Sequence, residues 1–153
     1  MNKTAILSPA EGRVCAIERG ASQKISIFLA LWDNHVNCSP IAGRVERIIH
    51  TPGRYLPALF GSAVRRNENN WISIRGDQFE VGVRQIAGMV ARRIICDCRE
   101  GDRLQQGQRL GEILFGSRVD LHLPDHLKIL VRMGQQVRAG ETVVAAHPST
   151  GSG

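Results

Sequence analysis

The sequence has no long apolar run, few aromatic residues and only three lysines among its 20 basic residues. A helix that spans a bilayer needs about 20 consecutive apolar residues, and no segment of the 153 residues approaches that length. We therefore expect a cytoplasmic protein without a transmembrane segment, for which any membrane contact is peripheral and on the cytoplasmic face. Because aromatic residues make up only 5% of the chain, the core must be mainly aliphatic.

The cysteines lack a pattern that would indicate a metal site or a disulfide framework. Cys15, Cys38, Cys96 and Cys98 form no C-x-x-C pair. Structural zinc needs four ligands, which usually come as two closely spaced pairs, so we expect no metal. No signal peptide precedes the cysteines, which fits a reducing compartment. On a strand, Cys96 and Cys98 would share one face and pack as small apolar side chains.

The formal net charge of +6 suggests an anionic partner. Its arginines are scattered, and neither aromatic–basic interleaving nor a recognition-helix pattern accompanies them, so we expect no nucleic-acid partner. Anionic lipid headgroups or a phosphorylated substrate fit better. The alternative to an anionic partner is a basic surface that is only solvated and binds nothing.

Glycine and proline, 16 and 6 residues, are spread along the chain and favour short strands joined by turns. Apolar and polar residues alternate with period two over 24–28, 71–75, 79–84 and 118–123. Residues 86–95 fit both a strand and one face of a helix. We predict a single, mainly β domain over 1–146, with a β-rich α+β fold as the alternative, and a disordered tail over 147–153.

Two internal repeats suggest that the domain has pseudo-symmetric halves. The pattern Ser-Pro-x-x-Gly-Arg-Val begins at Ser8 and again at Ser39, and glycines spaced by six residues begin at Gly101 and at Gly134. Each repeat is a turn that leads into a strand, and the arrangement resembles the barrel-sandwich hybrid of biotinyl and lipoyl carrier domains. Such carriers modify a lysine in a tight hairpin. Lys3, Lys24 and Lys128 lack that setting, which disfavours a carrier function.

The Gly116-Ser117 dipeptide lies between a hydrophobic segment and an alternating one. A serine hydroxyl can attack the carbonyl of the residue before it, and glycine at that position has no side chain to obstruct the attack. β-Elimination from the resulting ester, followed by hydrolysis that releases ammonia, would leave a pyruvoyl group on the new N-terminus, a carbonyl cofactor that forms a Schiff base with an amine substrate. The dipeptide recurs at Gly61-Ser62 and Gly151-Ser152, so by itself it indicates only a turn or a linker.

Several separated stretches together resemble the phosphatidylserine decarboxylase family, particularly its short, archaeal-type branch. They lie at residues 8–14, 25–28, 33–37, 39–43, 51–53, 67–68, 85–94 and 115–121. The resemblance favours a strand over 86–95. It implies self-cleavage between Gly116 and Ser117 into fragments 1–116 and 117–153, a pyruvoyl group derived from Ser117, and a homo-oligomer.

The resemblance also implies catalytic roles for His35 and Glu11. His35 matches a family histidine and would activate Ser117. At position 11 the family usually has an aspartate, whose carboxylate is thought to orient the catalytic base. The glutamate of this chain has a side chain one methylene longer. Cys38 stands where another branch has a second histidine, and Asn69 where the family often has arginine. Arg92 or Arg93 could bind a phosphate.

The sequence therefore predicts a pyruvoyl-dependent decarboxylase that converts phosphatidylserine to phosphatidylethanolamine and CO2. A related decarboxylase of a soluble amino acid or phosphoserine ester is the first alternative, and a binding module that never cleaves is the second. The substrate follows from the family resemblance alone.

Overall fold

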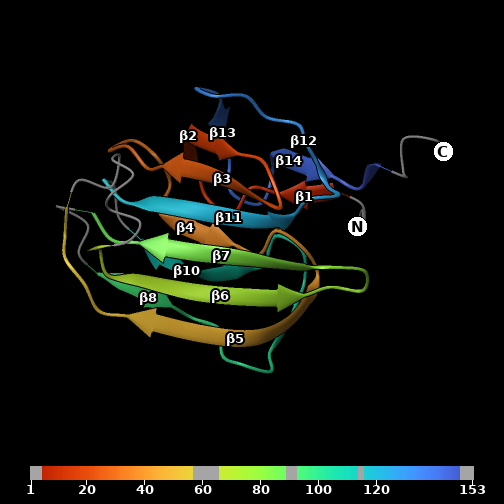
Figure 1. The fold of residues 1–153 in the computed structure, drawn as a ribbon. Coiled ribbons are helices and arrows are strands. Elements are labelled where there is room, and N and C mark those ends of the chain that lie inside the picture. The colour runs from red at the N-terminus through yellow and green to blue at the C-terminus, as the bar shows by residue number, and fades with distance from the viewer. Residues whose placement is uncertain (1–4, 57–65, 89–92, 114–115, 149–153) are drawn as a thin grey trace.

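The computed structural model describes residues 5–56, 66–88, 93–113 and 116–148. These residues form fourteen strands joined by turns and loops (Figure 1). The strands are β1 (Ala5–Leu7), β2 (Gly12–Glu18), β3 (Ser22–Phe28), β4 (Val36–Cys38), β5 (Gly43–Thr51), β6 (Asn69–Arg75), β7 (Glu80–Ile86), β8 (Ile94–Cys96), β9 (Arg103–Leu104), β10 (Arg109–Ile113), β11 (Arg118–Pro124), β12 (Lys128–Ile129), β13 (Gln136–Val137) and β14 (Val143–Ala146). The mainly β prediction is confirmed.

Eight strands form one curled sheet in the order β13-β2-β3-β11-β7-β6-β5-β9. Two three-stranded sheets, β1-β14-β12 and β4-β10-β8, complete the fold. Gln85, on β7, donates hydrogen bonds to the Asn37 side chain of β4 and to the Ile95 carbonyl of β8. The β4-β10-β8 sheet therefore covers the inner face of β7.

The core between these layers is aliphatic. Val119, Leu121 and Leu123 point inward from β11 and are almost completely buried. Among the described residues, Phe79 is the one aromatic side chain in the core cluster. The low aromatic content of the sequence thus corresponds to a core built from branched side chains, which suit strands because they pack well on a pleated surface.

The two sequence repeats occupy equivalent places on either side of the central β11–β7 pair. In one half Gly12 pairs with Val137, and in the other Gly43 pairs with Leu104. The hydroxyl groups of Ser8 and Ser39 each bond the carbonyl two residues later, at 2.7 Å. The repeated glycines have the positive φ angles that tight turns require: Gly101 (93°), Gly107 (84°), Gly134 (84°) and Gly140 (70°). The predicted pseudo-symmetry is confirmed.

The four segments with clear alternation are all strands, each within one or two residues of its expected bounds. The expected strand over 86–95 is wrong in its middle, because Ala87, Gly88 and Arg93 lie outside β7 and β8. Residues 89–92 lie outside the described residues, as do 149–153 of the expected tail. His147, where that tail was expected to begin, stacks its ring 6.5 Å from that of Phe79.

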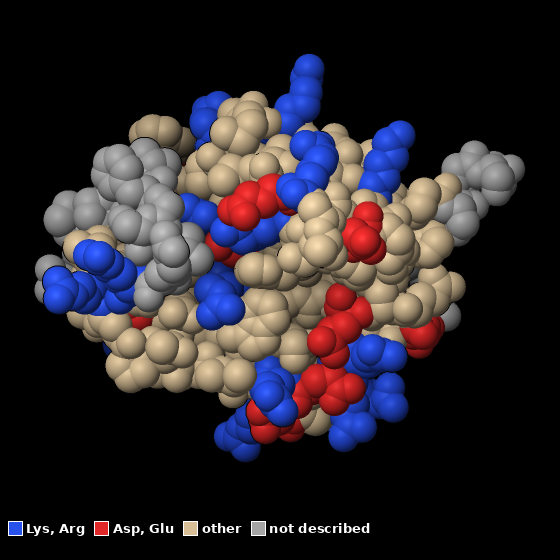
Figure 2. All heavy atoms as spheres, viewed as in Figure 1, with Lys and Arg blue, Asp and Glu red and all other residues tan. Residues whose placement is uncertain are grey.

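Within the described ranges, no helix has both the length and the apolar character needed to cross a bilayer. On the face drawn in Figure 2, basic and acidic side chains are intermixed over the outer surface of the large sheet. The arginines are therefore as scattered on this face as they are in the sequence.

Candidate active site

The Gly116-Ser117 bond is held at one end of the large sheet, where β11 begins. The amide of Gly116 donates a hydrogen bond to the Leu29 carbonyl at 2.6 Å, and the amide of Leu29 donates to the Ser117 carbonyl at 3.0 Å. Leu29, which directly follows β3, therefore brackets the Gly116-Ser117 bond: it forms a backbone hydrogen bond with the residue on each side of it. Gly116 has a φ of 81°, in the left-handed region that favours glycine.

Gly88 lies against the same bond from the neighbouring side. A Cβ atom placed on Gly88 would overlap the carbonyl oxygen of Gly116, and it would lie 2.7 Å from the carbonyl carbon. Only a residue without a side chain fits this space. Glycine at position 88 thus allows the backbone after β7 to approach the carbonyl that a cleavage reaction would attack.

The residue after Ser117 fixes the position of β11. The Arg118 guanidinium bonds the Asp120 carboxylate at 2.8 Å and the Ser26 hydroxyl at 2.8 Å, and all three residues are buried. Because side chains alternate along a strand, Arg118 and Asp120 lie on the outer face of the sheet. Ser117, which is completely buried, lies on the same inner side as Val119.

A buried network of amide side chains connects this inner face to the covering sheet. Gln85 is the strand partner of Val119, and it bonds the side chains of Asn37 at 2.9 Å and Asn70 at 3.0 Å. All three amides are buried. The network therefore fixes Asn37, two residues after His35, against the strand next to β11.

His35 comes from the covering sheet at the end that holds Ser117. Its carbonyl accepts a hydrogen bond from the amide of Ile113 at 3.0 Å, which extends the pairing of β4 with β10 by one residue. Because Asn37 contacts Gln85, and His35 precedes Asn37 by two residues, both side chains project from the covering sheet toward the large sheet. The topology thus brings His35 and Ser117 to the same end of two facing layers.

Glu11 contacts the backbone of the loop that carries His35. Its carboxylate accepts a hydrogen bond from the amide of Asn34 at 3.1 Å, and the Arg138 guanidinium lies 4.0 Å from it. Asp33 is buried in the same loop and accepts hydrogen bonds from the amide of Ala30 and the side chain of Gln136, both at 2.7 Å. Two carboxylates therefore hold the residues immediately before His35.

The other residues singled out in the sequence have different surroundings. Both side-chain groups of Asn69 bond within the protein, to Arg84 at 2.6 Å and to the Asn67 carbonyl at 3.0 Å. Arg93 is exposed, and Arg92 lies outside the described residues. Cys38 is half-buried on β4, where desolvation raises the pKa of its thiol.

Cys96 and Cys98 lie side by side with their sulfur atoms 3.8 Å apart. The hydrogen bond between the two sulfur atoms lowers the pKa of Cys96 to about 6, and the same interaction raises the pKa of Cys98. In the described part of the chain, no group of three or more histidine, cysteine, aspartate or glutamate side chains could hold a metal ion. The two thiols form a close pair rather than two independent apolar side chains.

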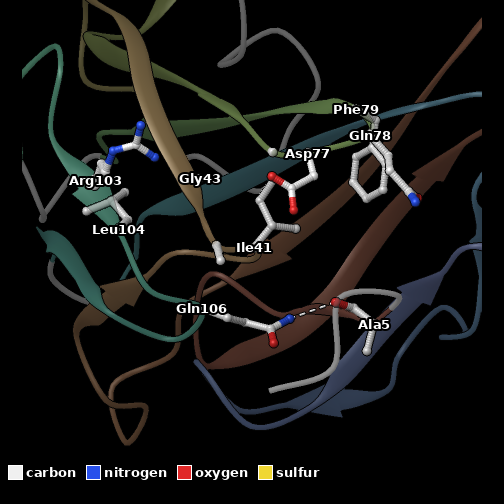
Figure 3. A pocket seen from close by; sticks show the side chains of 11 residues that line it. Ala5, Ile41, Gly43, Asp77, Gln78, Phe79, Arg103, Leu104 and Gln106 are labelled. Carbon is white, nitrogen blue, oxygen red and sulfur yellow. Dashed lines mark hydrogen bonds between the residues drawn. The ribbon is translucent and has the colours of Figure 1, made fainter.

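A cavity of about 330 Å³ lies at the opposite end of the large sheet (Figure 3). Its lining includes Phe79, Arg103 and Gln106, and Gln106 bonds the carbonyl of Ala5 at 2.7 Å. This end is the pseudo-symmetric counterpart of the Ser117 end: Gly76 donates to the Phe79 carbonyl as Leu29 donates to that of Ser117. None of the residues predicted to be catalytic lines the cavity, so we place the chemistry at the Ser117 end.

Comparison with known proteins identifies the family of the chain. The family model for phosphatidylserine decarboxylase matches residues 1–145. The chain belongs to the phosphatidylserine decarboxylase family. A phosphatidylserine decarboxylase proenzyme from Desulfotalea psychrophila is 41% identical over 150 residues, which cover 92% of this chain and 70% of the relative. A second, from Beijerinckia indica, is 40% identical over 156 residues, which cover 95% of this chain and 67% of the relative.

Sequence reasoning missed three contributors to the candidate site of this phosphatidylserine decarboxylase family member. The backbone of Leu29 left no sequence signal, because any residue can supply an amide and a carbonyl. Gly88 lies inside a stretch that resembles the family, but its contact with Gly116 joins residues 28 positions apart. Gln85 would have been visible only as a polar residue on the face of its strand that Val81 and Val83 mark as apolar, and nothing in the sequence joins it to Asn37.

We predict that Gly88→Ala will slow the cleavage between Gly116 and Ser117 by roughly a hundredfold or more, because the added methyl group must displace the carbonyl that is attacked. The measurement is the rate at which full-length chain disappears in denaturing electrophoresis after expression. Gly101→Ala is the control for backbone strain alone, since alanine is strained at the positive φ of Gly101 but has no atom within 4 Å of its added Cβ. Equal cleavage rates for the two variants would contradict the role assigned to Gly88.

Proposed function

We propose that the chain is a proenzyme that cuts itself between Gly116 and Ser117 and then decarboxylates phosphatidylserine to phosphatidylethanolamine and CO2. Membership of the family supports the reaction. The observation that carries the cleavage site is the bracketing of the Gly116-Ser117 bond by Leu29, with Gly88 against its carbonyl. The contact of Gly88 is the more specific of the two features, because the hydrogen bond between Leu29 and Ser117 has a counterpart between Gly76 and Phe79.

Self-cleavage begins with the Ser117 hydroxyl, which must lose its proton to attack the Gly116 carbonyl carbon. The two hydrogen bonds to Leu29 restrict rotation of the bond, and such fixed orientation lowers the entropic barrier to an intramolecular attack. His35 is the base in this proposal because it comes from the facing layer at the same end of the sheet. Glu11 is a positioning residue that acts through the amide of Asn34.

The residues around Ser117 fit the pyruvoyl group that the family implies. Ser117 is completely buried, so water has little access to a carbonyl formed there. The strand that follows it pairs on both edges, with β3 and β7, and cleavage breaks none of these pairings. When present, the group supplies an electron sink for loss of the substrate carboxylate.

During turnover the protein must orient the substrate and return a proton to the product carbon. We assign proton transfer to His35, for the same positional reason as in self-cleavage. Asn69 bonds Arg84 and the Asn67 carbonyl, so its departure from the family residue leaves no free amide aimed at a substrate.

We predict that the wild-type protein will separate under denaturing conditions into fragments 1–116 and 117–153, the second with a blocked N-terminus. Ser117→Ala removes the attacking oxygen and should give only intact chain in mass spectrometry. Ser62→Ala, which changes the serine of another Gly-Ser dipeptide, should be cleaved normally. Under native conditions the two fragments should elute together, because β11 lies in the middle of the large sheet. A stable, uncut wild-type chain would overturn the proposal.

We predict that His35→Ala will lower decarboxylation by a factor of about 100 to 10,000 per mole of pyruvoyl group, the usual range for loss of a general acid or base. Normalising to the pyruvoyl group separates turnover from maturation. His126→Ala is the matched control, because His126 contacts Phe79 at the opposite end of the sheet. Phosphatidylserine, serine and phosphoserine should be assayed side by side with the wild-type protein. Wild-type turnover in His35→Ala would exclude His35 as the proton donor.

We predict that Glu11→Gln will slow self-cleavage by roughly tenfold or more, because it keeps an oxygen for the Asn34 amide but loses the negative charge next to the loop that carries His35. Glu11→Asp, which restores the usual family residue, should cleave faster than the wild type and leave turnover of the mature enzyme nearly unchanged. Time courses of full-length chain measure both effects. Glu46→Gln, at an exposed position on β5, is the control. If both Glu11 variants mature at the wild-type rate, Glu11 does not position the base.

A further inference from the structure

Two bulky apolar side chains are exposed next to the candidate active site. Leu31 is 66% exposed and Trp32 is 76% exposed, whereas the other tryptophan, Trp71, is partly covered by its contacts with His122 and Arg84. Single exposed apolar residues are common on protein surfaces. Two adjacent ones at the tip of one turn are a feature that neither the core nor the proposed chemistry explains.

The fold holds this turn in a defined shape. Asp33 is 4% exposed, and its carboxylate accepts hydrogen bonds from the amide of Ala30 and from Gln136 of β13. The amide of Asp33 also donates to the Ala30 carbonyl at 3.1 Å. A buried carboxylate therefore closes the turn over residues 30–33, and the exposed Leu31 and Trp32 form its tip.

The position of the turn connects it to the substrate. It begins directly after Leu29, which brackets the Gly116-Ser117 bond, and it ends directly before Asn34 and His35. An apolar tip at this point lies at the edge of the site that must receive the serine headgroup of a lipid. A headgroup at a membrane surface is within reach of such a site only if this edge faces the membrane.

Exposed cationic side chains accompany the turn. Arg138 is two residues from Gln136, which bonds Asp33, and its side chain is 67% exposed. Arg13 is exposed, and it pairs in register with Gln136 and with Phe28. The Arg13 guanidinium donates to the Gly134 carbonyl, and that of Arg138 lies 4.0 Å from Glu11, which bonds the amide of Asn34. Exposed arginines near a membrane surface add electrostatic attraction to anionic lipids, while tryptophan prefers the boundary between headgroups and acyl chains.

We propose that the turn over residues 30–33 inserts Leu31 and Trp32 into the headgroup boundary of an anionic phospholipid bilayer and so presents the active site to its lipid substrate. The identity of that lipid rests on the function proposed above. Insertion of a few apolar side chains together with basic residues gives reversible, peripheral binding. A second copy of this chain is the other surface that could cover the turn, and the experiments below separate the two.

The first experiment measures binding without catalysis. The intact protein is sedimented with vesicles of phosphatidylcholine containing phosphatidylserine, and with vesicles of phosphatidylcholine alone. We expect Leu31→Ser/Trp32→Ser to weaken binding to the mixed vesicles by roughly tenfold or more. The control is Leu130→Ser/Val143→Ser. Leu130 and Val143 are 47% and 40% exposed, and the amide of Leu130 bonds the carbonyl of the neighbouring Val144. They lie beside β12 and on β14, away from the start of β11 (Figure 1).

Trp32 also reports on its own surroundings. In Trp71→Phe the remaining tryptophan is Trp32, because the chain contains two. Its fluorescence should shift to the blue on addition of the mixed vesicles, and lipids brominated near the headgroup should quench it. Equal sedimentation of the wild type and Leu31→Ser/Trp32→Ser, or unchanged Trp32 fluorescence with vesicles, would overturn the proposal. Conversion of a wild-type dimer to a monomer by the same double variant, with vesicle binding unchanged, would assign the turn to self-association instead.

A second assay separates this proposal from the proposed activity. Short-chain phosphatidylserine below its critical micelle concentration offers the headgroup without a membrane. We expect Leu31→Ser/Trp32→Ser to retain wild-type turnover of this dissolved lipid and to lose about tenfold of its rate on vesicles. Equal rates on vesicles would overturn membrane insertion, whereas absence of decarboxylation by the wild type in both forms would overturn the proposed function alone. Urea unfolding of each variant confirms that the fold is retained.

Discussion

The pairing of β11 on both of its edges is the constraint on which the rest of this molecule depends. Seven consecutive residues of β11 pair with β3, and five of them also pair with β7. This pairing makes β11 a central strand of the large sheet, although it comes late in the chain. The start of β11 is therefore a rigid position, and Ser117 lies at that position next to Leu29. A hydroxyl group on a free loop would sample many orientations, most of them unsuitable for attack on its own backbone.

Buried polar groups on the two faces of the sheet fix the register of this strand. On the outer face, Arg118 bonds Asp120 and Ser26, so a slip by one residue would move a charged pair into the aliphatic core. Breaking a buried ion pair by removing one partner typically costs about 3–5 kcal/mol. On the inner face, Gln85 connects β7 to Asn37 and Asn70. These bonds fix the position of the covering β4-β10-β8 sheet relative to the large sheet, and this position determines where His35 lies.

Pseudo-symmetry gives the two ends of the large sheet similar local structure but different connections. The Gly76–Phe79 hydrogen bond corresponds to the one between Leu29 and Ser117. At the Phe79 end, however, the two strands follow each other directly in the chain and are joined by a short hairpin. At the Ser117 end the paired strands are distant in sequence, so the chain after Leu29 is free to form the turn over residues 30–33 and the loop with His35. Similar local pairing therefore leads to a closed hairpin at one end and, at the other, to the loop that carries His35.

The sequence by itself determined the strand-rich fold, the repeated turns, the family and the Gly116-Ser117 dipeptide. Alternation with period two and the spacing of glycines are local properties, which any short segment displays regardless of its neighbours. The failure within 86–95 has the same origin, because an apolar segment reads alike as strand, helix or close-packed loop. Only the tertiary structure decided that Gly88 touches Gly116, that Leu29 brackets Ser117, and that Gln85 meets Asn37. These contacts join residues far apart in the chain, and they depend on strand order and on the layer that covers the sheet, neither of which a local pattern encodes.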